Sequence, residues 1–152
     1  IGGKSTEELM SEIETKGMNI SNGAKKILRD PSLFRTSENS SDINFIILSL
    51  GEMGFNDTDS SESRIERAKE LGLNLCPPEA ILAFRIKYQN QSRGDFVQIV
   101  TEPFIEIDKS DNRFSTHNQL FVENVENKLY INTTFDGSHP MNSNFKMMFR
   151  VY

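Results

Sequence analysis

Apolar residues recur at helical spacing near the start of the chain. Ser5 and Glu8 have the spacing of a capping box, in which each residue satisfies a free N–H group of the other at a helix N-terminus. Leu9 and Ile13 follow on one helical face, and Gly17 is a suitable C-terminal stop. The pattern predicts a short first helix.

A second short helix is predicted just beyond it. It begins at Ser21, continues through Ala24 and Ile27, and ends at Asp30 and Pro31. Two short helices joined by a glycine turn also occur in helix-turn-helix DNA-binding proteins. We interpret this pair as a packed helical hairpin because the chain as a whole is acidic.

The chain between Pro31 and Gly72 gives both ambiguous and clear signals of secondary structure. Residues 44–50 are rich in branched and aromatic side chains, which suit a buried strand or a buried helix. Residues 56–63 (NDTDSSES) resemble a calcium loop in composition but lack the glycine and the bidentate glutamate that such a loop needs. We interpret them as the loop before a third helix, over residues 64–71, which Gly72 ends.

The fourth predicted helix begins at Pro78. Prolines suit the first turn of a helix because the missing N–H would be unpaired there. This helix is expected to be central to the core. The expected core face comprises Ala80, Ala83, Phe84 and Tyr88, widened by Ile81, Leu82 and Ile86.

After Gly94 the pattern changes to strands. Glu126 and Asn127 lie between two alternating segments and predict a tight hairpin turn. The expected fold is therefore α+β, with N-terminal short helices followed by a mainly antiparallel sheet packed on a central helix. We expect one domain, helical over about residues 4–91 and strand-rich over about residues 95–152, which is cut from a longer chain. The predicted strands span residues 96–101, 104–107, 120–125, 128–134 and 145–151.

Charge and length narrow the classes of partner. The chain has 152 residues, 17 basic against 22 acidic, and a formal net charge of −5. Because nucleic-acid binding depends on neutralising phosphates, this balance argues against a nucleic-acid partner. The longest apolar run is far short of the roughly 20 residues that span a membrane. With a single cysteine and no signal segment, we expect a soluble cytoplasmic protein.

One region has a recognisable pattern of residues. Residues 68–79 read AKELGLNLCPPE, and Arg85, Tyr88, Gln91 and Gly94 follow at three-residue intervals. This pattern, with the opening IGGK, resembles a family of uncharacterised bacterial proteins. Three positions depart from the family pattern, at Phe84, Ser92 and Phe96. The resemblance implies a bacterial protein and carries over no activity.

Few residues could support metal or thiol chemistry. Cys76, His117 and His139 are too few for a four-ligand zinc site, so no metal and no cofactor are expected. Cys76 has apolar neighbours, and we predict a buried, protonated thiol instead of a nucleophile. The DGSHP segment at residues 136–140 contains His139 but has the composition of an ordinary turn.

The candidate binding residues are Glu79, Arg85, Tyr88, Glu102 and His139. Arg85 lies beside an apolar stripe, so its charge must reach solvent or find a partner. We predict an ion pair with an acid from the C-terminal half, with Glu102 as the first choice.

These features favour a protein-binding module. The alternative is a small hydrolase or transferase whose site lies where the central helix meets the sheet. A cleft on which the candidate residues converge would indicate the enzyme. An exposed apolar surface would indicate the binding module.

Overall fold

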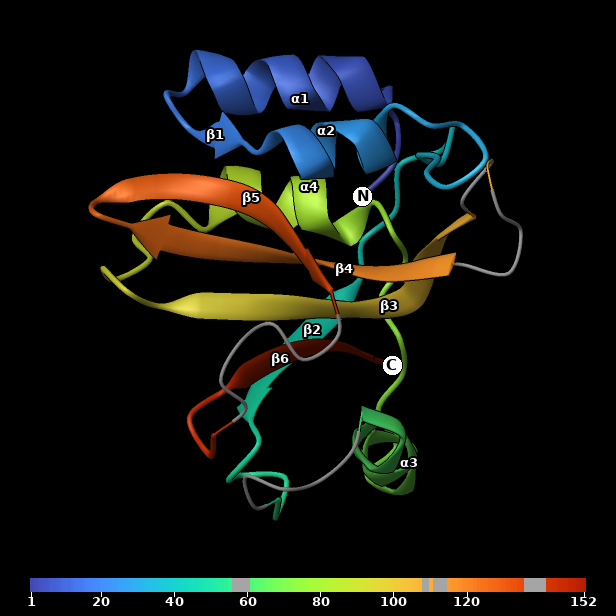
Figure 1. The fold of residues 1–152 in the computed structure, drawn as a ribbon, viewed down its shortest axis with the longest axis vertical. Coiled ribbons are helices and arrows are strands. Elements are labelled where there is room, and N and C mark those ends of the chain that lie inside the picture. Colours follow the sequence, from blue (N-terminus) through green and yellow to red (C-terminus); the bar gives the residue numbers. More distant parts are fainter. Residues whose placement is uncertain (56–60, 108–109, 111–114, 136–141) are drawn as a thin grey trace.

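The computed structural model describes residues 1–55, 61–107, 110, 115–135 and 142–152, and these form helices on both faces of a sheet (Figure 1). None of the helices within these ranges is long and apolar enough to cross a membrane. The helices are α1 (Thr6–Thr15), α2 (Asn22–Leu28), α3 (Ser61–Glu70) and α4 (Ala80–Lys87). The strands are β1 (Asn19–Ile20), β2 (Asn44–Ser49), β3 (Phe96–Ile107), β4 (Ser115–Val125), β5 (Lys128–Phe135) and β6 (Lys146–Val151).

The six strands form one mixed sheet in the order β1-β5-β4-β3-β6-β2. Three strand pairs are antiparallel: β2–β6, β3–β4 and β4–β5. The pairs β1–β5 and β3–β6 are parallel. The α+β class, the N-terminal helices and the mostly antiparallel sheet are thus confirmed. The ambiguous segment at residues 44–50 forms an edge strand and not a helix.

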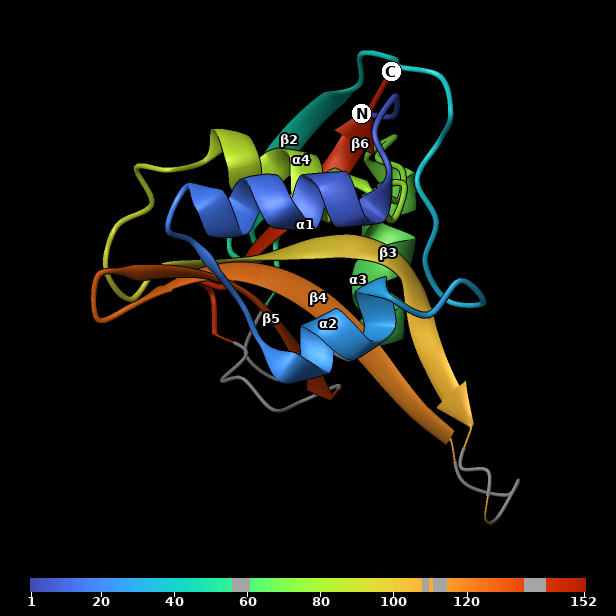
Figure 2. The ribbon, with the colours of Figure 1, turned by 90° about the horizontal axis from the view of Figure 1, so that it is seen from above.

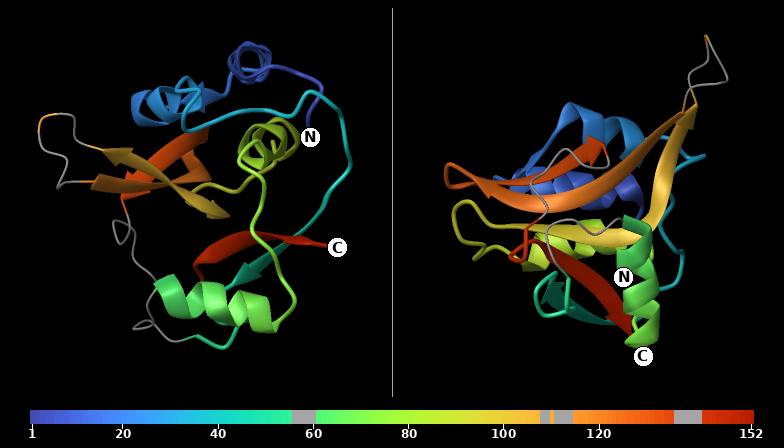
Figure 3. Two further views of the ribbon diagram at one scale, coloured as in Figure 1. Left: turned by 90° about the vertical axis from the view of Figure 1, so that its right-hand side faces the viewer. Right: turned by 60° about the horizontal axis from the view of Figure 1, so that its bottom comes forward.

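Helices cover the sheet unequally. α1, α2 and α4 lie on one face, and α3 lies on the other, beside β6 and β2 (Figures 2 and 3). The first face buries the larger apolar cluster, which includes Ile13, Ile27 and Leu82 with Val122 and Ile131 from the strands. The second face buries a smaller cluster around Phe145, Met147 and Phe149.

The predicted helix signals are present in the structure. Ser5 and Glu8 form the reciprocal capping box of α1, and the Ser21 side chain accepts a hydrogen bond from the Ala24 N–H at the start of α2. The fourth helix begins at Ala80, two residues after the predicted start.

The predicted core face of α4 is partly wrong. Its fully buried residues are Ala80, Ile81, Leu82 and Arg85, whereas Phe84 is only partly buried. The apolar pattern alone could not indicate that a charged residue occupies the centre of the buried face.

Two local features shape the sheet. Glu126 (φ 52°) and Asn127 (φ 67°) both adopt the left-handed conformation, as the predicted tight hairpin between β4 and β5 requires.

In β3 the pairing with β4 shifts between Ile99 and Phe104, so residues 100–103 stand opposite Gln119 alone. This bulge merges the two strands predicted at residues 96–101 and 104–107 into one bent strand.

α2 packs very closely on β5. A Cβ added at Gly23 would lie 2.7 Å from Cγ2 of Thr133, while the Thr133 hydroxyl donates to the Gln119 carbonyl (3.1 Å). Gly23 therefore sets how closely the helix approaches the sheet.

We predict that Gly23→Ala does not raise the free energy of unfolding in the wild-type background, because the added methyl group collides with Thr133. In a Thr133→Ser background the collision is absent and the hydroxyl remains. Alanine should then stabilise the protein through its higher helix propensity. The expected coupling in a double-mutant cycle is about 1 kcal/mol, measured by urea unfolding. Independent effects of the two substitutions would contradict this packing.

Candidate functional site

Glu79 binds the N-terminal segment and does not cap α4. It is 3% exposed, and its carboxylate accepts hydrogen bonds from the Gly2 N–H (3.0 Å), the Ser37 N–H (3.2 Å) and the Ser37 hydroxyl (2.5 Å). A Cβ at Gly2 would lie 2.1 Å from the Asn39 carbonyl oxygen, so only glycine fits beside this carboxylate. Glu79 joins three segments that are distant in sequence, which is a structural role.

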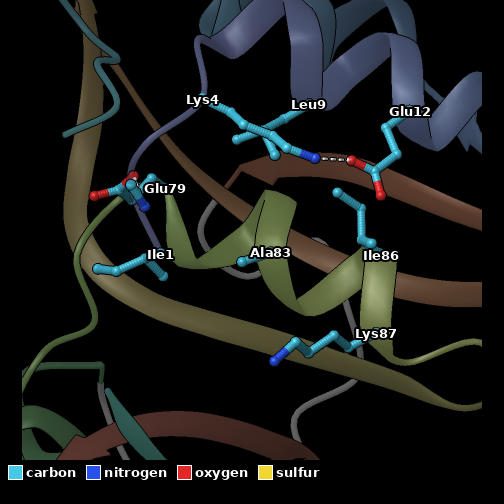
Figure 4. Close-up of a pocket in the computed structure, with 9 residues that line it drawn as sticks. Ile1, Lys4, Leu9, Glu12, Glu79, Ala83, Ile86 and Lys87 are labelled. Carbon is cyan, nitrogen blue, oxygen red and sulfur yellow. Dashed lines mark hydrogen bonds and ion pairs between the residues drawn. The ribbon is translucent and has the colours of Figure 1, made fainter. Parts of the chain in front are cut away.

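A small pocket lies between α1 and α4 beside Glu79 (Figure 4). Its volume is about 180 Å³, and Ala83 and Ile86 of α4 contribute apolar surface. Across it, Lys4 and Glu12 form an ion pair (2.7 Å), and the hydrogen bond from Lys4 lowers the pKa of Glu12. Ligand sites usually exceed roughly 300 Å³. The pocket is therefore too small for a substrate site.

Arg85 is fully buried but does not pair with Glu102, so that prediction is wrong. One guanidinium nitrogen donates to Oε1 of Gln91 (2.7 Å) and to the Tyr130 carbonyl (3.5 Å). The second terminal nitrogen donates to the Tyr88 carbonyl at the C-terminus of α4, whereas Nε has no hydrogen-bond partner among the described residues. Burial lowers the pKa of Arg85 to about 10, so the group remains charged at neutral pH.

Gln91 connects Arg85 to the sheet. Its amide group donates to the carbonyls of Asp95 and Val122, both at 3.1 Å. The Gln91 carbonyl in turn accepts from the Asn124 side chain (2.6 Å). The chain between α4 and β3 is thus held to β4 by buried amide groups.

Tyr88 lies at the edge of the hydrogen-bond network that Arg85 and Gln91 form. Its ring stacks on Phe84 (4.9 Å between centroids), and its hydroxyl donates to Asp95 (3.3 Å). Burial, together with the Asp95 carboxylate, raises the pKa of Tyr88 and keeps the phenol protonated. Asp95 also pairs with Lys146 (2.7 Å), which links the network to β6.

The four candidate residues that the structure describes do not converge on one cleft. Arg85 and Tyr88 lie together, Glu79 lies at the opposite end of α4, and His139 lies outside the described residues. Where α4 meets the sheet, the space is filled by the buried side chains of Ile81, Leu82 and Arg85. Among the described residues, this interface is thus packed with side chains, and the hydrolase or transferase hypothesis stays a prediction.

Glu102 lies in a separate cleft between α3 and the opposite face of the sheet, at the bulge of β3. We name it the α3 cleft; its volume is about 400 Å³. Sequence reasoning considered His117 only for metal or thiol chemistry and did not identify Gln98 or Gln119, although period-two alternation in β4 places His117 and Gln119 on one face. The charged and amide-bearing lining residues are Arg64, Lys69, Gln98, Glu102, His117 and Gln119.

Cys76 is 4% exposed and its Sγ donates to the Met148 carbonyl (3.4 Å). Burial raises the pKa of the thiol from 9.0 to about 12. The predicted burial is confirmed, and the thiol lacks the lowered pKa of a nucleophile. Within the ranges that the structure describes, no three His, Cys, Asp or Glu side chains are grouped as metal ligands.

We predict that Arg85→Ala lowers the free energy of unfolding by about 3 kcal/mol, because it opens a cavity and leaves the Gln91 and Tyr88 oxygens unpaired. The matched control is Lys87→Ala, an exposed cation on the same helix, which should change stability by less than about 0.5 kcal/mol. Chemical denaturation measures both. A fully stable Arg85→Ala protein would place Arg85 in a functional site instead.

We also predict that Cys76 resists a thiol reagent at pH 7 until the protein unfolds. Because its folded pKa is raised, the thiol stabilises the fold below pH 9, and this contribution is lost as the pH rises from 9.0 toward 12. Stopped-flow labelling in increasing urea should give a rate that follows the unfolded fraction. Fast labelling of the native protein would contradict the burial.

Comparison with known proteins leaves the chain without an assigned family. A scan against family models found no match. Searches of the curated proteins and of the solved structures also found no match.

Proposed function

We propose that this chain is a protein-binding module that pairs the free edge of β2 with an extended segment of another protein. β2 is the last strand of the sheet and pairs through one edge with β6. No strand lies on its other side among the residues that the structure describes. Strand addition at such an edge is a common mode of peptide recognition.

The hydrogen bonds at the end of β2 show which backbone groups point outward. The Leu50 N–H donates to the Phe145 carbonyl (2.9 Å), toward β6, whereas the Ser49 N–H donates to the Glu52 carboxylate (2.7 Å) on the other side. Because backbone direction alternates along an antiparallel strand, the N–H and C=O groups of Phe45 and Ile47 face outward. They are the groups available to a partner strand.

The side chains of β2 favour an apolar partner. The strand, NFIILS, contains no charge and no proline, and Ile46 and Ile47 are each 36% exposed. These two residues project from opposite faces of the strand. Proteins usually protect edges of this kind with charges, prolines or bulges. The absence of such protection within the strand is the observation that carries the proposal.

Charges at the ends of β2 suggest the flanks of the partner segment. Asp42 precedes the strand and Glu52 follows it, in a chain with a net charge of −5. A partner with alternating apolar residues between lysines or arginines would complement both features. The resemblance over residues 68–94 further leads us to propose a bacterial cytoplasmic partner, although the resemblance itself carries no activity.

We predict that Ile47→Pro abolishes partner binding and leaves the fold intact. Proline removes the outward N–H of Ile47 but no hydrogen bond to β6, and it is tolerated where an edge faces solvent. The measurement is selection from a library of displayed extended peptides, followed by titration of a selected peptide. Selected peptides should alternate apolar residues between basic flanks.

The matched control is Ile105→Lys, because Ile105 is an exposed isoleucine (45%) on β3. Ile47→Lys should weaken peptide binding at least tenfold, and Ile105→Lys should not change it. Amide exchange at Phe45 and Ile47 should slow when peptide is bound. Peptide binding that survives both β2 variants would reject the proposal.

A further inference from the structure

The α3 cleft contains a buried hydrogen-bond acceptor that the described protein does not satisfy. Oε1 of Gln119 is buried and has no partner among the described residues. An acceptor left in this state loses its bonds to water without replacing them, at a cost of about 1–3 kcal/mol. Such groups are rare in folded proteins, and a bound ligand is one reason to retain them.

Further polar side chains in the cleft are also unused by the described part of the chain. Four of these side chains make no hydrogen bond or ion pair with another described residue: Lys69, Gln98, Glu102 and His117. In contrast, three of the four charged side chains that line the small pocket on the other face, Lys4, Glu12 and Glu79, are engaged within the protein, and the fourth is Lys87. The α3 cleft therefore combines available donors and acceptors with room for a small molecule.

The strand bulge explains why these groups share one cleft. Residues 100–103 stand opposite Gln119 alone, and this extra length bends β3 where Glu102 and Pro103 line the cleft. Bulges often occur next to binding and active sites, where they redirect side chains. A volume of about 400 Å³ lies within the range of small-molecule sites, roughly 300–1,000 Å³.

We propose that the α3 cleft binds a small zwitterion of the amino-acid class. The ligand ammonium group donates to the Glu102 carboxylate and, once the Gln119 side chain rotates toward the cleft, to Oε1 of Gln119, which is closed to solvent in the unliganded protein. The ligand carboxylate faces Lys69 on α3. Leu75, Val100 and Met147 supply the apolar part of the lining, so the geometry favours an amino acid with an aliphatic side chain. This proposal does not depend on the proposed strand pairing at β2, and the two are tested by separate experiments.

The test is titration of the isotope-labelled chain with each of the twenty amino acids, monitored by NMR at the side-chain amides of Gln98 and Gln119. Leucine should shift these resonances in a saturable way. Acetate and isobutylamine serve as single-charge probes, and each should bind at least tenfold more weakly than leucine. Equal binding of either probe would overturn the zwitterion assignment, and no response to any amino acid would overturn the site.

Two variants test the assigned groups. Gln119→Leu removes the unsatisfied acceptor, so the unliganded protein should be as stable as the wild type or more stable, and leucine binding should weaken at least tenfold. Glu102→Gln should also weaken binding at least tenfold. The matched control is Glu66→Gln, which removes a charge from α3 outside the cleft and should bind leucine as the wild type does. Undiminished binding by either cleft variant would overturn the proposal.

Discussion

The buried guanidinium of Arg85 is the constraint on which the middle of the structure depends. A buried charge without hydrogen-bond partners is very costly, so the surrounding chain must supply acceptors. Here they are neutral: the Gln91 side chain and the carbonyls of Tyr88 and Tyr130. The positive charge also lies at the C-terminal end of α4, where the helix dipole favours it. One side chain thereby fixes the end of a helix, the following loop and a strand of the sheet.

The opposite end of α4 is fixed by a charge of the opposite sign. The Glu79 carboxylate accepts hydrogen bonds from the N–H groups of Gly2 and Ser37. These bonds hold the N-terminal segment and the chain after α2 against the helix. Glu79 and Arg85, two charged residues of the stretch that carries the bacterial resemblance, thus both have structural roles. The three-residue spacing of Arg85, Tyr88 and Gln91 is explained in the same way, because each binds where the chain leaves α4 for the sheet.

Sequence reasoning succeeded where the determining interactions are local. The capping box at Ser5 and the hairpin at Glu126 and Asn127 depend on a few neighbouring residues, so their signals are readable from the chain. It failed for Arg85, because a sequence displays a charge but not the carbonyl groups that a fold can bring to it. The α3 cleft was missed for a related reason: Glu102 and Gln119 meet only through strand pairing and a bulge.

The order of the strands explains why recognition is expected away from the central helix. β2 lies early in the chain yet ends the sheet, because β6 inserts between it and β3. The face that α1, α2 and α4 cover is closed by the larger apolar cluster and by the network around Arg85. Among the described residues, buried side-chain atoms without a partner occur in this network, at Nε of Arg85 and Oδ1 of Asn124, as well as in the α3 cleft, at Oε1 of Gln119. We propose the outer edge of β2 and the α3 cleft as binding surfaces because both face outward from the covered core. On these proposals, a fold that uses Arg85 and Glu79 for its own cohesion binds its partners through backbone groups at a sheet edge and through polar side chains in the α3 cleft.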